Sequence, residues 1–246
     1  MNETGIVIVA WNAEAEIGAC LDAALRFCDD IVVVDNGSRD ATADLVRARQ
    51  RVRLIVNDEN RGFAAAANQG VRAIDRPFVL VLNPDAVIET VLDPMVDCCR
   101  EPDVAAVGGK LLDAEGRPQT GFLVRRFPGG WTLAFEVLGV NRLVPSNPVN
   151  RRYRALDLDP DLPAEVDQPA GALLMLRREV WETLGGFAED FYPLWFEDVD
   201  FAKRARDRGY RLRYAPEVCA RHRGGYSAAL LSWERRQIYW YANLLR

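Results

Sequence analysis

Residues 32–42 read VVVDNGSRDAT, and this stretch decides the fold. Its apolar start belongs to Ile31–Val34, a β-branched run that predicts a buried strand. The polar residues 35–38 then predict a turn, and Arg39–Arg49 follows with the spacing of a helix. A strand, a polar turn and a helix in this order predict half of a parallel βαβ unit. Ligands of such units bind beyond the carboxyl end of the strand.

The same alternation fills the first 110 residues of the chain. Because crossovers between parallel strands are right-handed, the carboxyl ends of the predicted strands meet at one edge of the sheet. The sequence therefore predicts an α/β fold with a mostly parallel central sheet flanked by helices. The predicted strands are Gly5–Ala10, Ile31–Val34, Val52–Val56, Phe78–Leu82 and Val104–Gly108, and the predicted helices are Ala15–Phe27, Arg39–Arg49, Gly62–Ile74 and Val87–Cys99.

The alternation stops near Lys110. From there to about Gln168 the chain is richer in Pro, Gly, Asn and Arg, which predicts an irregular insertion over the edge of the sheet. Regular patterns then return, so we expect a single domain over residues 1–246. The later predicted strands are Ala170–Leu176 and Tyr210–Tyr214, and the later predicted helices are Arg178–Leu184, Val199–Arg208 and Leu230–Leu245.

The composition excludes several classes of protein. The 246 residues carry a net charge of −5, which is unfavourable for general nucleic-acid binding. No run of 18 apolar residues is present that could span a membrane. The five cysteines are odd in number and form no CxxC pair, so we expect neither a disulfide framework nor a zinc site. Free cysteines predict a reducing compartment, which favours a cytoplasmic location.

Polar residues follow three of the predicted strands. Trp11-Asn12 follows the first, Asp35 ends the second, and Asn83-Pro84-Asp85 follows the fourth. Each group alone is typical of a turn, but three at one sheet edge favour a ligand crevice. The sequences GxGxxG and GxxxxGK[ST] are both absent, which argues against a dinucleotide enzyme and a P-loop enzyme. An aspartate in the second position can bind a base or ribose, and a carboxylate in the third can hold Mg²⁺ or Mn²⁺ between two phosphates.

Six stretches of this sequence follow one known pattern in one order. Together they resemble the inverting family 2 glycosyltransferases of the GT-A fold, and most closely the bacterial rhamnosyltransferase-like branch that builds cell-surface polysaccharide. The resemblance covers nearly the whole chain and is weakest between about residues 116 and 165. The stretches are Ile6–Asn12, Val32–Thr42, Asn60–Gly70 (NRGFAAAANQG), Leu80–Ala86 (LVLNPDA), Gly171–Phe187 and Trp195–Ala205 (WFEDVDFAKRA).

The resemblance implies a donor site and a metal site. The metal motif of the family is usually Asp-x-Asp, but Asn83 stands in the first place here, which leaves Asp85 as the main carboxylate. The lone histidine, His222, precedes two glycines and matches a family position that supports the metal or the diphosphate. The residues that the resemblance assigns to the nucleotide are Ala10, Trp11, Asn12, Asp35, Gly37, Asn68 and Asn83.

Glu197-Asp198 matches the catalytic pair of the family. An inverting transfer needs a base that takes the proton of the acceptor hydroxyl. We expect Asp198 to be this base and Glu197 to position the base or the acceptor. Both residues are predicted near a helix start, where N–H groups would lower the pKa of Asp198 and keep it ionised. Taken alone, the pair would equally fit acidic residues that cap a helix.

The resemblance implies transfer of a sugar from a nucleoside diphosphate to a hydroxyl group of a cell-surface glycan or lipid-linked acceptor. It favours dTDP-rhamnose as the donor, ahead of a UDP-hexose. Residues 1–109 would form the nucleotide-sugar-binding half, and residues 110–246 the acceptor-side half with the C-terminal helix. The alternatives are a non-catalytic relative that binds nucleotide sugar or glycan, and a nucleotidyltransferase. The latter needs a Gly-rich loop after the first strand, and this sequence lacks it.

The helix predicted at Leu230–Leu245 combines apolar, aromatic and arginine side chains. This pattern suits a peripheral helix on the inner face of the membrane, and equally a helix docked on the core or on a second subunit of a homodimer. The helix reaches Arg246 without a cap, so we expect the natural chain to continue. The arginines between Arg206 and Arg223 leave two interpretations, an ion-paired surface or a contact with anionic lipid.

Overall fold

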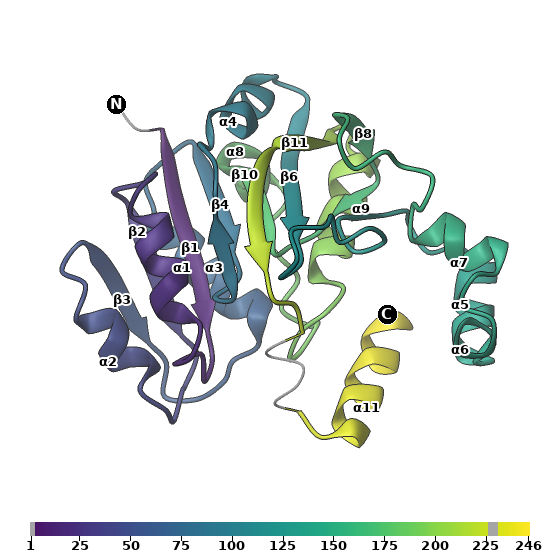
Figure 1. Ribbon diagram of the computed structural model, residues 1–246, viewed down its shortest axis with the longest axis horizontal. Helices are drawn as coiled ribbons and strands as arrows, with labels where there is room; N and C mark the ends of the chain where they lie inside the picture. The colour runs from purple at the N-terminus through teal and green to yellow at the C-terminus, as the bar shows by residue number, and fades with distance from the viewer. Residues whose placement is uncertain (1–2, 226–230) are drawn as a thin grey trace.

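The computed structural model describes residues 3–225 and 231–246 of the chain. Within them a sheet of nine strands runs through the molecule, flanked by helices (Figure 1). Its order is β3 (Val52–Val56), β2 (Ile31–Asp35), β1 (Thr4–Ala10), β4 (Phe78–Leu82), β10 (Leu173–Arg177), β6 (Val104–Leu112), β11 (Arg211–His222) and β5 (Ala86–Ile88), with β8 (Ala164–Val166) also on β11.

The amino-terminal strands form the predicted parallel sheet. β1 pairs in parallel with β2 and β4, and β2 pairs in parallel with β3. Every residue of β1, β2 and β4 is buried, as expected for parallel strands covered on both faces. The covering helices are α1 (Ile17–Ala24), α2 (Thr42–Arg47), α3 (Phe63–Ala73), α4 (Asp93–Arg100), α8 (Arg178–Thr183) and α9 (Glu197–Asp207).

The two halves of the chain share this sheet. β10 runs antiparallel between β4 and β6, so β6 points the same way as β4, and β11 lies parallel to β6. Most strands of the described sheet therefore point in one direction, and the predicted mostly parallel sheet is confirmed. Because β6 lies between β10 and β11, residues 1–109 do not form a sheet of their own.

The predicted start of one helix was wrong. The segment predicted as a helix over Val87–Cys99 begins as strand β5, and α4 starts only at Asp93. β5 pairs antiparallel with the end of β11, in the register Ala86 to His222. A partner so distant in sequence overrides the local helical pattern, because strand preference depends on the neighbours that a strand packs against.

The segment from Lys110 to Gln168 is more regular than predicted. It contains β7 (Val124–Arg125), paired with β9 (Gln168–Pro169), and the helices α5 (Gly130–Val137), α6 (Val140–Leu143) and α7 (Pro148–Tyr153). The three helices project from the side of the sheet (Figure 1), and α5 and α6 contain no buried residue. We call residues 126–156 the helical excursion. Short helices with little apolar burial leave a weak periodic signal, which explains the missed prediction.

The last helix, α11 (Trp233–Leu244), docks on the chain itself. The Trp240 ring lies 5.6 Å from the ring of Trp195 and 4.9 Å from that of Phe196. The Asn243 side-chain amide donates to the carbonyl of Leu194 at 2.9 Å. Among the described residues, no helix is long and apolar enough to cross a bilayer.

Candidate active site

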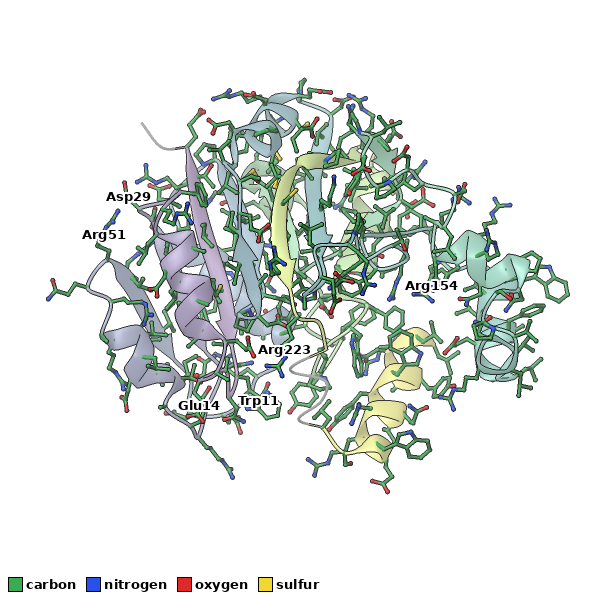
Figure 2. The ribbon with its side chains drawn as sticks, viewed as in Figure 1. Trp11, Glu14, Asp29, Arg51, Arg154 and Arg223 are labelled. Carbon is green, nitrogen blue, oxygen red and sulfur yellow. The ribbon has the colours of Figure 1, made fainter. Side chains whose placement is uncertain are left out.

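A cavity of about 260 Å³ opens at the carboxyl edge of the parallel strands. Strand ends form one side of it, and the start of α9 with residues 193–196 forms another. Trp11, after β1, and Arg223, after β11, mark this edge of the sheet in Figure 2. The polar lining residues are Asn36, Asn60, Asn83, Asp85, Arg125, Gln168, Glu197, Asp198 and His222, and the aromatic ones are Trp11, Phe63, Phe122, Trp195, Phe196 and Trp240.

Unpaired polar atoms gather around this cavity. Seven buried side-chain atoms of the described residues have no hydrogen-bond partner, and four belong to residues that line the cavity. Two of these are donors, Arg125 Nε and Trp240 Nε1, and two are acceptors, Gln168 Oε1 and Glu197 Oε2. A buried polar group without a partner costs about 1–3 kcal/mol. Such a concentration indicates that the cavity is built for a ligand with both donors and acceptors.

Asp85 and His222 form the side of the cavity suited to a metal. Asp85 directly precedes β5 and His222 ends β11, so the pairing of these strands brings the two residues together. His222 Nε2 lies 3.4 Å from Asp85 Oδ1, and both side chains are buried. The Asp85 Oδ2 atom accepts from the backbone N–H of Gly224 at 3.2 Å, which leaves Oδ1 directed at the histidine.

A glutamine that the sequence analysis missed fixes the histidine. Gln119 Nε2 donates to the His222 carbonyl at 2.6 Å, so Gln119 Oε1, 3.1 Å from His222 Nδ1, must accept. Nδ1 is therefore the nitrogen that donates to Gln119, and Nε2 is the nitrogen that faces Asp85. Metal-binding histidines are held in this way by a partner on their other nitrogen. The Phe122 ring, stacked 5.4 Å from the imidazole, further restrains it.

Asp85 and His222 thus fit one divalent cation, with an oxygen and a nitrogen ligand. They do not complete its coordination. In the described part of the chain, no group of three or more His, Cys, Asp or Glu side chains lies close enough together to hold a metal. A cation here needs further ligands from a bound molecule, and phosphate oxygens are the usual choice for Mg²⁺.

Glu197 and Asp198 lie in the first turn of α9. Asp198 Oδ2 accepts from the side-chain amide of Gln168 at 2.8 Å and from the backbone N–H of Gly171 at 3.1 Å. Its Oδ1 accepts from the N–H of Val199 at 2.8 Å. Glu197 Oε2 has no such partner. The two carboxylates therefore differ, since one is fixed by three donors and the other is partly free.

Burial raises the pKa of both carboxylates. It raises the pKa of Glu197 well above its usual value, and the neighbouring Asp198 charge raises this pKa further. Burial also raises the pKa of Asp198, against the opposing effects of Arg125 and of the N–H groups of Gly171 and Val199. The prediction that helix N–H groups leave Asp198 with a lowered pKa was wrong, because the cost of burying the charge exceeds their effect.

The backbone before these carboxylates is strained. Trp195 has a φ of 76° and Phe196 a φ of 74°, in the left-handed region that bulky residues rarely adopt. Strain of this kind costs about 1–3 kcal/mol for each residue and concentrates at functional sites. Here it turns the chain into α9 so that Glu197 and Asp198 line the cavity.

The residues predicted to bind the nucleotide fall into three groups. Trp11 and Asn83 line the cavity. A second group, Ala10, Asn12, Asp35 and Gly37, lies at the same sheet edge without lining the cavity. Asp35 there accepts from the Ser38 hydroxyl, and Asn12 Oδ1 accepts from the Arg39 N–H at 2.8 Å.

The third group is Asn68 alone. Its amide donates to the Phe187 carbonyl at 2.8 Å and to Glu189 at 3.0 Å, and its oxygen accepts from the Phe187 N–H at 2.9 Å. These bonds fasten α3 to the segment after α8. The structure therefore does not bring Asn68 into the cavity with Trp11 and Asn83.

Several lining residues were missed by the sequence analysis. Arg125, Gln168 and Phe122 come from the stretch predicted as irregular, and no motif marks them. Asn36 was visible beside Asp35, and it orders the loop after β3 by accepting from Asn57 Nδ2 at 3.1 Å. The same Asn36 oxygen also accepts from the Arg61 N–H at 3.0 Å, which orders the later part of this loop.

Known proteins resemble this chain over most of its length. The family model for glycosyl transferase family 2 matches residues 5–182. Glycosyltransferase AglE of Haloferax volcanii is 25% identical over 88% of this chain, which spans 66% of AglE. The O-antigen chain rhamnosyltransferase WbaN of Salmonella anatum is 22% identical over 80% of this chain, which spans 57% of WbaN. The chain is thus shorter than these curated relatives.

Solved glycosyltransferases share the fold. GalNAc-T7, solved with UDP, GalNAc and Mn²⁺, superposes with a TM-score of 0.65 at 15% identity, over 89% of this chain and 43% of its own. The mannosyltransferase PcManGT of Pyrobaculum calidifontis, solved with GDP-Man and Mn²⁺, gives 0.61 at 22% identity, over 96% of this chain and 60% of its own. Since the family match covers well over half of the residues and the sheet has the GT-A arrangement, this chain belongs to glycosyl transferase family 2.

Proposed function

We propose that this chain transfers a sugar from a nucleoside diphosphate donor to a hydroxyl group of a glycan or lipid-linked acceptor, with inversion at the transferred carbon. The observation that carries the proposal is the shared cavity. It joins a metal-type pair, Asp85 and His222, to a carboxylate pair, Glu197 and Asp198. A metal-assisted displacement by a hydroxyl group needs both.

The donor would lie along the carboxyl ends of β1 and β4. Trp11 offers an aromatic wall there, and Asp35 ends β2 at the same sheet edge, opposite Ala10. We favour dTDP-rhamnose over a UDP-hexose because two relatives, WbaN and RfbN of Salmonella, are named O-antigen chain rhamnosyltransferases. Relatives of 22% identity support this choice of donor without determining it.

Asp85 Oδ1 and His222 Nε2 would hold Mg²⁺ or Mn²⁺. The bound cation would offset the negative charge that develops on the leaving diphosphate. Gln119 would keep the Nε2 lone pair available, and Gly224 would keep Asp85 oriented. Asn83, whose amide lies 3.4 Å from His222 Nε2, borders the same position.

Asp198 would take the proton of the acceptor hydroxyl. Its Oδ2 atom accepts two hydrogen bonds, whereas Oδ1 accepts one and keeps a lone pair for the acceptor. A raised pKa makes its carboxylate a stronger base near neutral pH. Glu197, with a free Oε2, would hold a second hydroxyl group of the acceptor.

We also propose peripheral contact with the inner face of an anionic membrane. The helical excursion carries five arginines against one glutamate in a chain whose net charge is −5. It also exposes large apolar side chains, among them Trp131 (75% exposed) and Leu143 (83% exposed). Apolar and cationic groups on short helices suit an anionic bilayer surface. A cytoplasmic location and a homodimer both remain predictions from the sequence.

The central test is nucleotide release from a panel of nucleotide sugars, with Mn²⁺ or Mg²⁺ and with or without an acceptor. Faster release of one nucleoside diphosphate, lost without the cation, is the expected result. Binding of nucleotide sugars without any release or transfer would favour the alternative, a non-catalytic binding relative.

A further inference from the structure

We propose that Arg125 forms a subsite for a phosphate group of the acceptor, beside the Asp198 base. The inference rests on the proposed function, since it names the chemistry of the acceptor. Arg125 ends β7 and lines the cavity. Among the described residues, its side chain has no ion pair within 4 Å and no hydrogen bond, and its Nε is buried without a partner. A cationic group held in a cavity in this state is suited to an anionic ligand.

The neighbouring arginine on the chain is paired. Arg126 forms an ion pair with Asp157 at 2.5 Å. Other arginines of the same region are also paired, for example Arg206 with Asp167 and Arg204 with Asp200. Arg125 thus differs from these three arginines because it lines the cavity and has no ion-pair partner among the described residues.

The position of Arg125 assigns it to the acceptor side. In the β7–β9 pair, Arg125 lies directly opposite Gln168. Gln168 in turn donates to Asp198 Oδ2 at 2.8 Å. Arg125 also lies close enough for its charge to lower the pKa of Asp198 against the effect of burial. Since the acceptor hydroxyl must reach Asp198, an anionic group next to that hydroxyl would meet Arg125.

Two aromatic rings restrain the guanidinium group. It lies 5.8 Å from the Phe122 ring and 5.7 Å from the Tyr153 ring. A planar guanidinium group that is already ordered can donate two parallel hydrogen bonds to a phosphate. The ligand chemistry that fits is a phosphate or diphosphate ester of the acceptor, whether lipid-linked or a soluble sugar phosphate. A neutral glycan would leave the charge of Arg125 unpaired.

Binding of simple probes tests the subsite without any transfer assay. The full chain is first saturated with UDP and Mn²⁺ so that the donor phosphate site is filled. Farnesyl diphosphate and glucose 1-phosphate are then titrated by calorimetry, with farnesol and glucose as their neutral counterparts. We expect Arg125→Gln to weaken binding of the phosphorylated probes about 10- to 100-fold. Arg126→Gln, the matched control, should leave this binding unchanged, and Arg125→Lys should restore part of it.

The outcomes separate the alternatives. Preference for farnesyl diphosphate supports a lipid-linked acceptor, and equal binding of glucose 1-phosphate supports a soluble one. Equal affinity in wild type and Arg125→Gln would overturn the proposal, as would an equal loss in Arg126→Gln. Probes that compete with UDP would assign Arg125 to the donor instead and would also overturn it. If neither dTDP nor UDP binds, the proposed function fails, whereas the same titrations without nucleotide still test Arg125.

Discussion

Glu197 and Asp198 are neighbours in sequence, yet their carboxylates have different surroundings. Asp198 is held by Gln168, Gly171 and Val199, so its position is fixed before any acceptor arrives. Pre-oriented groups avoid the cost of ordering in the transition state. Glu197 instead keeps a buried oxygen without a partner, which is a cost to the fold that a bound hydroxyl group would remove.

The role of Asp198 as base can be tested by Asp198→Asn. The change keeps size and polarity but removes the proton acceptor, so transfer should slow by about 10²- to 10⁴-fold. The affinity for the donor, measured by calorimetry, should stay within a few-fold of wild type. Asp200→Asn is the matched control, because Asp200 lies in the same turn of α9 but pairs with Arg204. Transfer by Asp198→Asn at nearly the wild-type rate would refute the assignment.

Glu197 gives a prediction about stability and pH. Burial raises its pKa in the folded chain, so ionisation destabilises the fold as the pH rises above the unfolded value of about 4.3. Glu197→Gln removes this cost. The melting temperature of this variant should exceed that of wild type, and by more at pH 8 than at pH 5. Each kcal/mol gained in the free energy of unfolding should raise it by about 2–4 °C.

Glu179 provides the control for this experiment. It lies in the first turn of α8 and is exposed, so Glu179→Gln should show no comparable gain between pH 5 and pH 8. A Glu197→Gln chain no more stable than wild type at pH 8 would show that the buried charge carries no cost.

At the scale of the elements, the strands and helices of the first half follow from local patterns. Continuous apolar runs predicted β1, β2 and β4 to within a residue or two, since a buried parallel strand needs only such a run. β5 could not be predicted because its partner, the end of β11, lies far along the chain. β11 itself runs to His222, well beyond the predicted end at Tyr214, for the same reason.

The site shows the same division. Asp85, Glu197, Asp198 and His222 carry recognisable motifs, and the structure brings them to one cavity. Arg125, Gln119 and Gln168 carry none, because their roles arise from pairings such as β7 with β9 that no local pattern encodes. Asn68 lies in a recognisable motif but fastens two segments of the fold together. The motifs therefore located the ionisable groups of the cavity better than the residues that hold them in place.

The β5–β11 pair leads to a prediction about metal binding. With only Asp85 and His222 as ligands among the described residues, Mn²⁺ should raise the melting temperature more when UDP is present than when it is absent. Asp85→Ala should abolish this difference, and Asp113→Ala, on an exposed loop, should preserve it. Gln119→Leu should raise the Mn²⁺ concentration needed for the same shift in melting temperature about tenfold or more. The reason is that the His222 ring loses the partner that fixes its tautomer. The same response with and without UDP would contradict the incomplete site.

For the molecule as a whole, two surfaces differ in their charges. The arginines of β11 are ion-paired with acidic residues, whereas the helical excursion has more arginines than acidic residues. Arg211 and Arg221 on β11 pair with Asp103 and Glu89, which favours the ion-paired interpretation of that arginine run. The helical excursion differs, with five arginines against one glutamate. Its Arg142 contacts Gln237 on α11, so the two helical parts meet at this side of the molecule.

Membrane contact through the excursion can be measured with vesicles. The chain should sediment with phosphatidylglycerol vesicles at low salt, much less with phosphatidylcholine vesicles, and less again at 0.5 M salt. The double variant Trp131→Ser, Leu143→Ser should lose most of this binding. The control variant Val91→Ser, Leu162→Ser removes two exposed apolar residues outside the excursion, 55% and 59% exposed, and should keep this binding. Sedimentation unaffected by the first pair of changes would exclude the excursion as the contact.

The pairing of β5 with the end of β11 also bears on how the chain matures. A ribosome delivers Asp85 long before His222, so a growing chain holds one of these side chains without the other. A cation that requires both can be captured only after the last strand has closed onto the sheet. It would then bind chains in which β5 and β11 have paired, and not shorter ones, and by mass action it would favour this pairing. Metal capture by this chain would thus report that β11 has been made and has joined the sheet.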